Sequence, residues 1–270
     1  ITAASTGYVS SSLNITVVDI DTATLTAIFT EDFETDGQGS RYTATTPFTT
    51  SSHDHWNRTD GTNISNISGA YSSFSGTYFW ATEDSDNGGI NNHVQTIDIT
   101  GIDIVGATPL LFQGLFGAGN AGSNPKYDSV DYIRVEAQID GGGYNNVLWF
   151  SHVGGKNDNV AFGVDKDFDN LADSTDDLLG TALKSYSASI SGTGSTLDIR
   201  ISVHMEYGSE EVAFDNIQIL GAVSDDEAIT LSSASTTVDE GSTLAVTLSV
   251  PTNVDSDTVF NLTSGGDGSE

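Results

Sequence analysis

The feature that most constrains the fold is the strict alternation of apolar and polar residues along several short segments. In residues 197–205 every second side chain is apolar, and polar side chains stand between them. This is the period of a half-buried β-strand, and residues 13–17, 132–140 and 244–250 repeat it. No amphipathic helix is indicated beyond a short turn near Leu178. With Gly-, Asn- and Asp-rich turns between the strands, the sequence predicts an all-β protein, a β-sandwich of the jelly-roll type.

Two local patterns refine this prediction. The run Asp140-Gly141-Gly142-Gly143 separates residues 132–140 from an apolar segment at 146–150, which indicates a β-hairpin. In the last strand of this region, residues 212–220, the apolar positions change phase at Asp215-Asn216. We therefore expect a β-bulge there, which would turn a side chain toward a new direction.

The charge balance restricts the partners of the chain. Asp and Glu number 38 against 8 Lys and Arg, which gives a formal net charge of −30. Such a chain is repelled by nucleic acids and anionic membranes, and it attracts cations or neutral and basic surfaces. No apolar run is long enough to span a bilayer, so membrane insertion is not expected. A chain without cysteine that is acidic and rich in Ser, Thr, Asn and Gly is typical of secreted bacterial proteins that use calcium in place of disulfides.

Acidic side chains recur at fixed intervals in residues 165–176. Positions 1, 3, 5, 9 and 12 of this run are acidic: Asp165, Asp167, Asp169, Asp173 and Asp176. This is the spacing of a calcium loop of the D-x-[DN]-x-[DN]-G-x5-E kind. Such a loop surrounds Ca²⁺ with six to eight oxygens, and position 7, Leu171, offers its backbone carbonyl.

Two positions of this run depart from the pattern. Asn170 stands at position 6 where Gly is usual, and Asp176 stands at position 12 where Glu is usual. The flanks do not form two amphipathic helices, so we expect a calcium loop between strands. The alternative interpretation is a solvated acidic loop.

A second cation site is predicted where the first and last strands of the sandwich meet. Glu34 lies near the first strand and Asp215 in the last, and these strands lie side by side in such sandwiches. A shared cation would join the two strands. The alternative is that both residues are ordinary acids at strand edges. We interpret the acidic run at residues 83–87 as a loop rather than a site.

Residues 52–61 form the most unusual loop of the chain. Trp56 beside Arg58 offers an apolar face with a polar edge, which suits a sugar-binding platform. The competing interpretation places Trp56 in the core, as is usual for this residue type. His53 and His55 supply only two zinc ligands without a third nearby.

Near one end of the chain an alternating strand ends in Asp19-Ile20-Asp21, and the other end contains Thr237–Gly241 and Asn261–Ser264. These segments resemble parts of Calx-beta repeats. Residues 1–27 resemble the C-terminal hairpin of one repeat, and residues 228–270 resemble the N-terminal strands of another. The resemblance implies calcium-binding ends at Asp19, Asp21 and Glu240, which are incomplete because each repeat is cut. We therefore expect a piece of a longer multidomain protein, with neighbouring domains of the same chain as partners.

Residues 28–222 resemble the MAM-type jelly roll, a relative of concanavalin-like and laminin-G sandwiches. The matching segments are Asp32–Glu34, Gly76–Trp80, Asp131–Val135 with Leu148–Phe150, and Val212–Ile217. The cysteines of that family are missing. The resemblance implies an extracellular adhesion or recognition module. Carbohydrate-binding modules with a jelly-roll fold are recognition modules of the same kind.

Taken together, the sequence predicts a calcium-stabilised extracellular binding or adhesion module for a glycan or another cell-surface ligand. Two alternatives stay open: a non-catalytic accessory module of a secreted hydrolase, and a structural spacer of an adhesin stalk. No enzymatic activity is predicted, because the chain lacks both a Gly-x-Ser-x-Gly elbow and the E-x-D-x-x-E array of jelly-roll glycosidases.

Overall fold

The computed structural model describes residues 2–3, 11–18, 24–50, 54–64, 70–89, 93–119, 127–154, 162–174, 176–223, 230–233, 246–249 and 259–265. Across these ranges every regular element is a β-strand. No helix in the described residues is long and apolar enough to cross a membrane. The chain divides into two compact units, residues 25–223 and residues 1–24 with 224–270.

The smaller unit brings the two ends of the chain into one sheet. Strand β2 (Ser11–Val18) pairs antiparallel with β18 (Val259–Gly265) and with the short β1 (Thr2–Ala3). Strands β16 (Thr230–Ser233) and β17 (Val246–Ser249) form a separate pair. The strand predicted at residues 13–17 is confirmed as β2.

Several expectations for the two ends are not tested by this structure. Asp19, Asp21 and Glu240 lie outside the described residues, as do residues 244, 245 and 250 of the strand predicted at 244–250. The assignment of the two ends to Calx-beta repeats stays a prediction.

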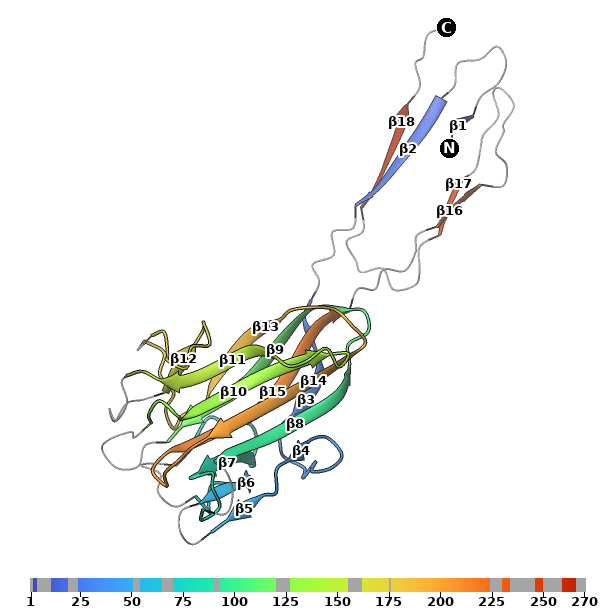
Figure 1. Cartoon of the computed structure of the whole chain (residues 1–270). Helices are drawn as coiled ribbons and strands as arrows, with labels where there is room; N and C mark the ends of the chain where they lie inside the picture. The colour runs from blue at the N-terminus through green and yellow to red at the C-terminus, as the bar shows by residue number, and fades with distance from the viewer. Residues whose placement is uncertain are drawn as a thin grey trace. The chain divides into compact units, whose positions relative to one another are not determined.

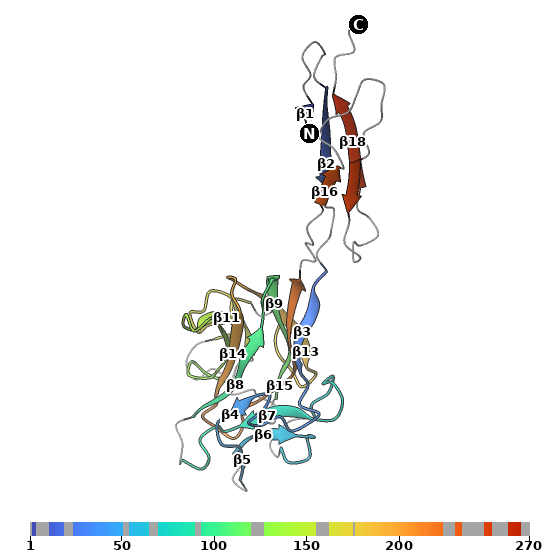
Figure 2. The same cartoon turned by 90° about the vertical axis from the view of Figure 1, so that its right-hand side faces the viewer.

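The larger unit is a sandwich of two sheets, which Figures 1 and 2 show as two layers. One sheet has six strands in the order β12 (Phe162–Asp165), β11 (Asn145–His152), β10 (Tyr132–Ile139), β14 (Thr196–His204), β8 (Val94–Asp103) and β4 (Thr43–Ala44). The other has seven: β13 (Lys184–Ile190), β9 (Ala107–Ala118), β15 (Glu211–Val223), β7 (Phe79–Glu83), β6 (His55–Thr59) and β5 (Phe48–Thr49) in order, with β3 (Thr26–Glu31) also paired to β15. All pairs of named strands are antiparallel. The predicted all-β jelly-roll sandwich is confirmed.

The core lies between the two sheets and follows the alternation seen in the sequence. Leu197, Ile199, Ile201 and Val203 of β14 have no exposed surface. Aromatic rings from the opposite sheet, among them Phe116 and Phe214, belong to the same buried cluster. Removing this apolar area from water, worth about 25 cal/mol per Å², is the main force that holds the layers together. The polar side chains of β14 are left on the outer face of its sheet.

Strand β15 pairs with three other strands of its sheet. It pairs with β9 along one edge, and its other edge is shared by β7 (at residues 211–214) and β3 (at residues 217–221). The change from β7 to β3 falls at Asp215-Asn216, where the register against β9 shifts and Asn216 has a φ of 47°. The predicted irregularity in this strand is thus confirmed, and the entry strand β3 does lie beside the exit strand β15.

The left-handed backbone of Asn216 gives a testable consequence. Asn216→Val should lower the free energy of unfolding by about 1–2 kcal/mol relative to Asn216→Gly, because a β-branched residue is strained at positive φ. Both variants lose the 3.1 Å bond that Gln218 Nε2 donates to Asn216 Oδ1, so their difference reports the backbone alone. Urea denaturation of the two variants in calcium measures it. Equal stability would contradict a strained bulge.

Candidate ligand-binding face and cation sites

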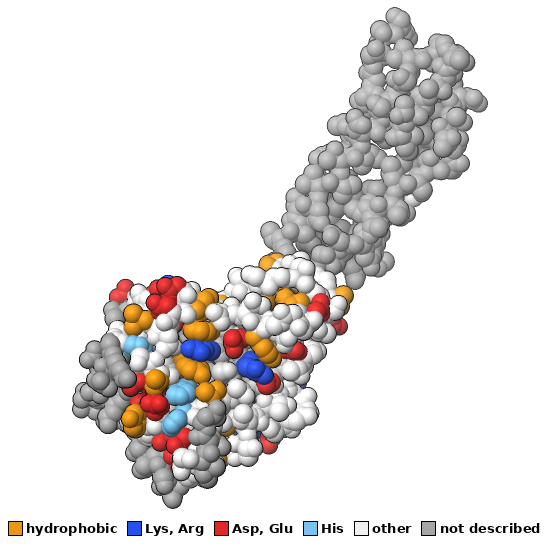
Figure 3. All heavy atoms as spheres, viewed as in Figure 1, with side chains coloured by type: hydrophobic (Ala, Val, Ile, Leu, Met, Phe, Trp, Pro, Cys, Tyr) orange, Lys and Arg blue, Asp and Glu red, His pale blue; other side chains and the backbone are white. Residues whose placement is uncertain are grey.

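A row of rings lies on the outer face of the six-stranded sheet. The Tyr132 and His204 rings are stacked, with centroids 5.5 Å apart and planes at 27°. The guanidinium carbon of Arg134 lies 3.8 Å from the Tyr132 ring centroid and 4.1 Å from that of Trp149. We call Tyr132, Arg134, Trp149 and His204 the aromatic row. The larger unit as seen in Figure 3 shows hydrophobic, basic and histidine side chains gathered on one face.

Strand register explains why these four residues meet. Tyr132 is the cross-strand partner of His204, and Arg134 is the partner of Trp149. Ile133 and Val135, on either side of Arg134, are buried in the core, so Tyr132 and Arg134 point outward. Directly opposed side chains in a sheet lie close enough to stack.

Arg134 is held by rings rather than by an acid. Its guanidinium donates to Asn170 Oδ1 at 3.3 Å, and among the described residues no carboxylate lies within ion-pair distance of it. Arg200 on the same face differs, because Asp98 binds it through two bonds of 2.6 and 3.1 Å. In a chain with a net charge of −30, an arginine without a carboxylate partner keeps donors available for a ligand.

The predicted calcium loop folds around Asp165, the buried last residue of β12. Four donors converge on its carboxylate: the amides of Phe168 (2.7 Å), Asp169 (3.2 Å) and Asn170 (2.8 Å), and the hydroxyl of Ser151 (3.0 Å). Phe168 and Asn170 adopt positive φ values of 63° and 73°, which bends the chain back on itself. Asn tolerates this conformation better than most residues, so its place at position 6 is understandable.

Three of the six predicted ligands of this loop come together. Asp165, Asp167 and Asp173 each offer a carboxylate oxygen, and these oxygens lie within 4.8 Å of one another. Desolvation, followed by the charges of Asp169 and Asp173, raises the pKa of the Asp167 carboxyl. A hard divalent cation would remove this repulsion, and an all-oxygen donor set fits calcium.

The other predicted ligands of the loop lie outside that group. Asp169 accepts a bond of 2.9 Å from the amide of the exposed Leu171. Asp176 is exposed, and its amide donates to Ser174 Oγ at 3.0 Å. Their part in a calcium shell stays a prediction.

The loop at residues 165–176 contacts the aromatic row. The Phe168 ring lies 5.3 Å from the Trp149 ring, edge to face, and Asn170 accepts from Arg134. The Asn170 amide group also donates to the carbonyl of Ser129 at 2.5 Å. A cation held by the loop would therefore fix the two residues that border Trp149 and Arg134.

The predicted Glu34–Asp215 pair is joined by one backbone segment. Asp215 accepts from the amide of Ser75 at 2.6 Å, and Glu34 accepts from the amides of Thr77 and Tyr78 at 2.7 Å each. Burial, together with the charges of Asp32 and Glu34, raises the pKa of Asp215 to about 7. The two acids thus share an electrostatic environment, and a shared cation stays a prediction.

The structure corrects the sugar platform predicted at Trp56 and Arg58. The Trp56 ring is fully buried, lies 5.0 Å from the Trp80 ring and donates to the carbonyl of Thr45 at 3.2 Å. A ring without exposed surface cannot stack on a sugar, so the burial agrees with the core interpretation.

Arg58 and the neighbouring histidines also have structural surroundings. Arg58 lies 3.6 Å from the Tyr78 ring centroid and donates to the carbonyls of Phe33 and Glu34. It therefore holds the turn that carries Glu34. His53 is outside the described residues, and His55 is buried.

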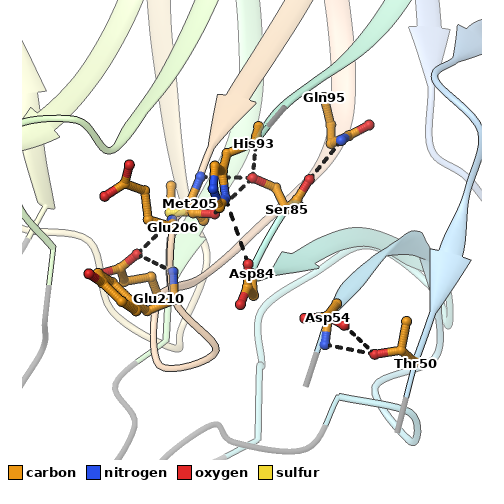
Figure 4. A network of polar contacts seen from close by, with 10 residues as sticks. Thr50, Asp54, Asp84, Ser85, His93, Gln95, Met205, Glu206 and Glu210 are labelled. Atoms are coloured by element: carbon orange, nitrogen blue, oxygen red, sulfur yellow. Dashed lines mark hydrogen bonds and ion pairs between the residues drawn. The ribbon is translucent and has the colours of Figure 1, made fainter. Parts of the chain in front are cut away.

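A third acidic group lies in the run 83–87. Asp84, Asp86 and His93 each offer a ligand atom within 4.8 Å of the others, and Figure 4 shows Asp84 beside His93. Burial, followed by the charges of Asp86 and Asp54, raises the pKa of Asp84 to about 7. Interpreting this run only as a loop overlooks the group, because His93 lies outside the run, directly before strand β8.

No family model and no curated protein matches the sequence. Among solved structures, the chain is similar to the CBM22-1 xylan-binding domain from Paenibacillus barcinonensis, with a TM-score of 0.37, 13% identity, and coverage of 76% of this chain and 99% of that chain. The chain is also similar to TmCBM61 in complex with beta-1,4-galactotriose, with a TM-score of 0.36, 10% identity, and coverage of 70% of this chain and 92% of that chain. Similarity to the K1 cleaved adhesin domain of Lys-gingipain from Porphyromonas gingivalis W83 has a TM-score of 0.36 and 12% identity, and it covers 71% of this chain and 96% of that chain. Likeness at this level transfers no function to the chain.

The surroundings of His204 predict how the row responds to acid. Burial, followed by the charges of His93 and Arg134, lowers the pKa of His204, while Asp128 acts in the opposite direction. The unfolded chain then takes up this proton at a higher pH than the folded protein. The free energy of unfolding should therefore fall as the pH drops below about 6.5.

An NMR titration of the His204 ring measures this directly. We expect a midpoint below about 6.5, the ordinary value for histidine. His204→Gln should lose this part of the acid sensitivity. A midpoint at or above the ordinary value would contradict the environment described for His204.

Proposed function

We propose that the outer face of the six-stranded sheet binds a glycan, and that calcium in the loop at residues 165–176 organises one end of this face. The observation that carries the proposal is the aromatic row, with Arg134 stacked on two rings and lacking a carboxylate partner among the described residues. Sugar rings have apolar faces that pack on aromatic rings, and their hydroxyls accept bonds from planar donors.

The charge of the protein favours a neutral ligand over a nucleic acid. A net charge of −30 repels phosphate backbones, and it opposes a neutral glycan much less. Recognition then depends on a few well-placed rings and polar groups, as in other small-molecule sites. An extracellular location, where such glycans and calcium are both plentiful, fits these requirements.

Calcium would act on the ligand face through Phe168 and Asn170. A cation bound only by the folded protein raises the free energy of unfolding by about 2.7 kcal/mol when its concentration is a hundredfold above its Kd. Extracellular modules use sites with a Kd of about 10⁻⁴–10⁻³ M, which extracellular calcium fills. Filling the loop would hold the Phe168 ring against Trp149 and the Asn170 amide against Arg134, which prepares the face for a ligand.

An adhesion module and an accessory module of a secreted hydrolase would use this face in the same way, and both depend on neighbouring domains of a longer chain. A structural spacer has no need for an outward row of stacked rings. The aromatic row therefore favours a binding role.

A glycan array probed with and without calcium tests the proposal. We expect binding to a defined glycan class that weakens when calcium is chelated. Tyr132→Ala and Arg134→Ala should each reduce affinity at least about tenfold, which corresponds to about 1.4 kcal/mol. The loss of a stacked ring or of the guanidinium accounts for this.

Lys184→Ala provides the matched control for these variants. Lys184 lies on β13 of the other sheet, paired with Asp177 at 3.1 Å, so its loss should leave glycan affinity unchanged. Wild-type protein that binds no glycan would contradict the proposal and favour the spacer. Equal losses in all three variants would place the site elsewhere.

A further inference from the structure

Two buried carboxylates oppose one another on the seven-stranded sheet. Glu211, the first residue of β15, is the direct cross-strand partner of Glu83, the last residue of β7. Their Cβ atoms are therefore about 5 Å apart. Glu211 is 0% exposed and Glu83 is 1% exposed. An acidic residue as buried as Glu211 almost always has a partner.

Strand alternation places this pair on the outer side of the sheet. Val212 and Phe214 belong to the core between the sheets, so Glu211 points the other way, toward a second buried cluster that contains Tyr71. Burial, and then the charges of Glu211 and Glu83, raise the pKa of the Tyr71 hydroxyl. The hydroxyl therefore lies within the field of both carboxylates.

Glu211 lacks the partners that a buried carboxylate needs. Within the described part of the chain, no donor reaches either of its two oxygens. Glu31 shows the contrast, because it is just as buried but accepts from the Phe33 amide at 2.9 Å and pairs with Arg41 at 2.7 Å. A carboxylate taken out of water without such partners is strongly unfavourable. Glu83, a second negative charge, adds repulsion.

We propose that a divalent cation, calcium in an extracellular setting, binds between Glu83 and Glu211. Carboxylate oxygens suit a hard cation, and neither oxygen of Glu211 has a hydrogen-bond donor among the described residues. The bound charge would cancel the repulsion and join β7 to β15 where the two strands meet. This site is separate from the loop at 165–176 and from Glu34–Asp215, and it does not depend on glycan binding.

A shared proton is the other way to neutralise the pair. Burial, followed by the charge of Glu83, raises the pKa of Glu211 to about 8, so the Glu211 carboxyl would hold a proton at neutral pH if no cation were bound. A bound cation and a shared proton predict different amounts of calcium per chain, and they predict different effects of Glu211→Gln on that amount.

Calcium content per chain separates the two cases. The full chain is brought to equilibrium by dialysis against saturating radioactive calcium, and the bound calcium is counted as the excess on the protein side. We expect Glu211→Gln to hold one calcium fewer than the wild type. Asp98→Asn should match the wild type, because Asp98 pairs with Arg200 away from the proposed cation sites.

Equal calcium content in the wild type and Glu211→Gln would overturn the proposal in favour of a shared proton. A calcium loss in Asp98→Asn as large as in Glu211→Gln would also overturn it, because the loss would not be specific to the pair. If Glu211→Gln does not fold, the variant Glu83→Gln/Glu211→Gln, which buries no charge, replaces it. Chelation should lower the melting temperature of that double variant less than that of the wild type, and an equal drop would count against the cation.

Discussion

The structure depends on how its crowded and buried carboxylates are neutralised. The sequence supplies 38 acidic residues and only 8 basic ones, so arginine and lysine cannot pair with most of them. Backbone amides take over part of this task. Asp165 accepts from three amides of its own loop. Asp215 accepts from the amide of Ser75, and Glu34 accepts from those of Thr77 and Tyr78. Each carboxylate thereby shapes the turn around it.

The remaining negative charge marks the places where cations are expected. Asp167 and Asp173 face Asp165, and Glu211 has no donor in the described residues. The first of these places adjoins the ligand face, because Phe168 and Asn170 belong to the same loop. Calcium would thus serve both the stability of the sandwich and the shape of the surface on which we propose that a glycan binds.

Much of the fold could be predicted because its signals are local. Alternation within residues 197–205 identifies a strand and its buried side without knowledge of its neighbours, and the phase change at Asp215-Asn216 reveals the irregularity of β15. The acidic loop at residues 165–176 could be singled out for the same reason, since its carboxylates lie within twelve residues, and its binding of calcium stays a prediction.

The rest depends on strand register, which the sequence does not show. Tyr132 and His204 are 72 positions apart, and each is an ordinary outward residue of its own strand, so nothing local marks them as partners. Glu83 and Glu211 meet only through the pairing of β7 with β15.

Terbium luminescence tests the central claim most directly, because Tb³⁺ occupies calcium sites and Trp149 beside Phe168 can sensitise its emission. The account predicts that Asp167→Asn lowers the affinity for Tb³⁺, measured from this emission, at least about tenfold. Asp103→Asn, at an exposed acid on β8, should leave the affinity unchanged. Equal titrations of the two variants would show that residues 165–176 are a solvated acidic loop.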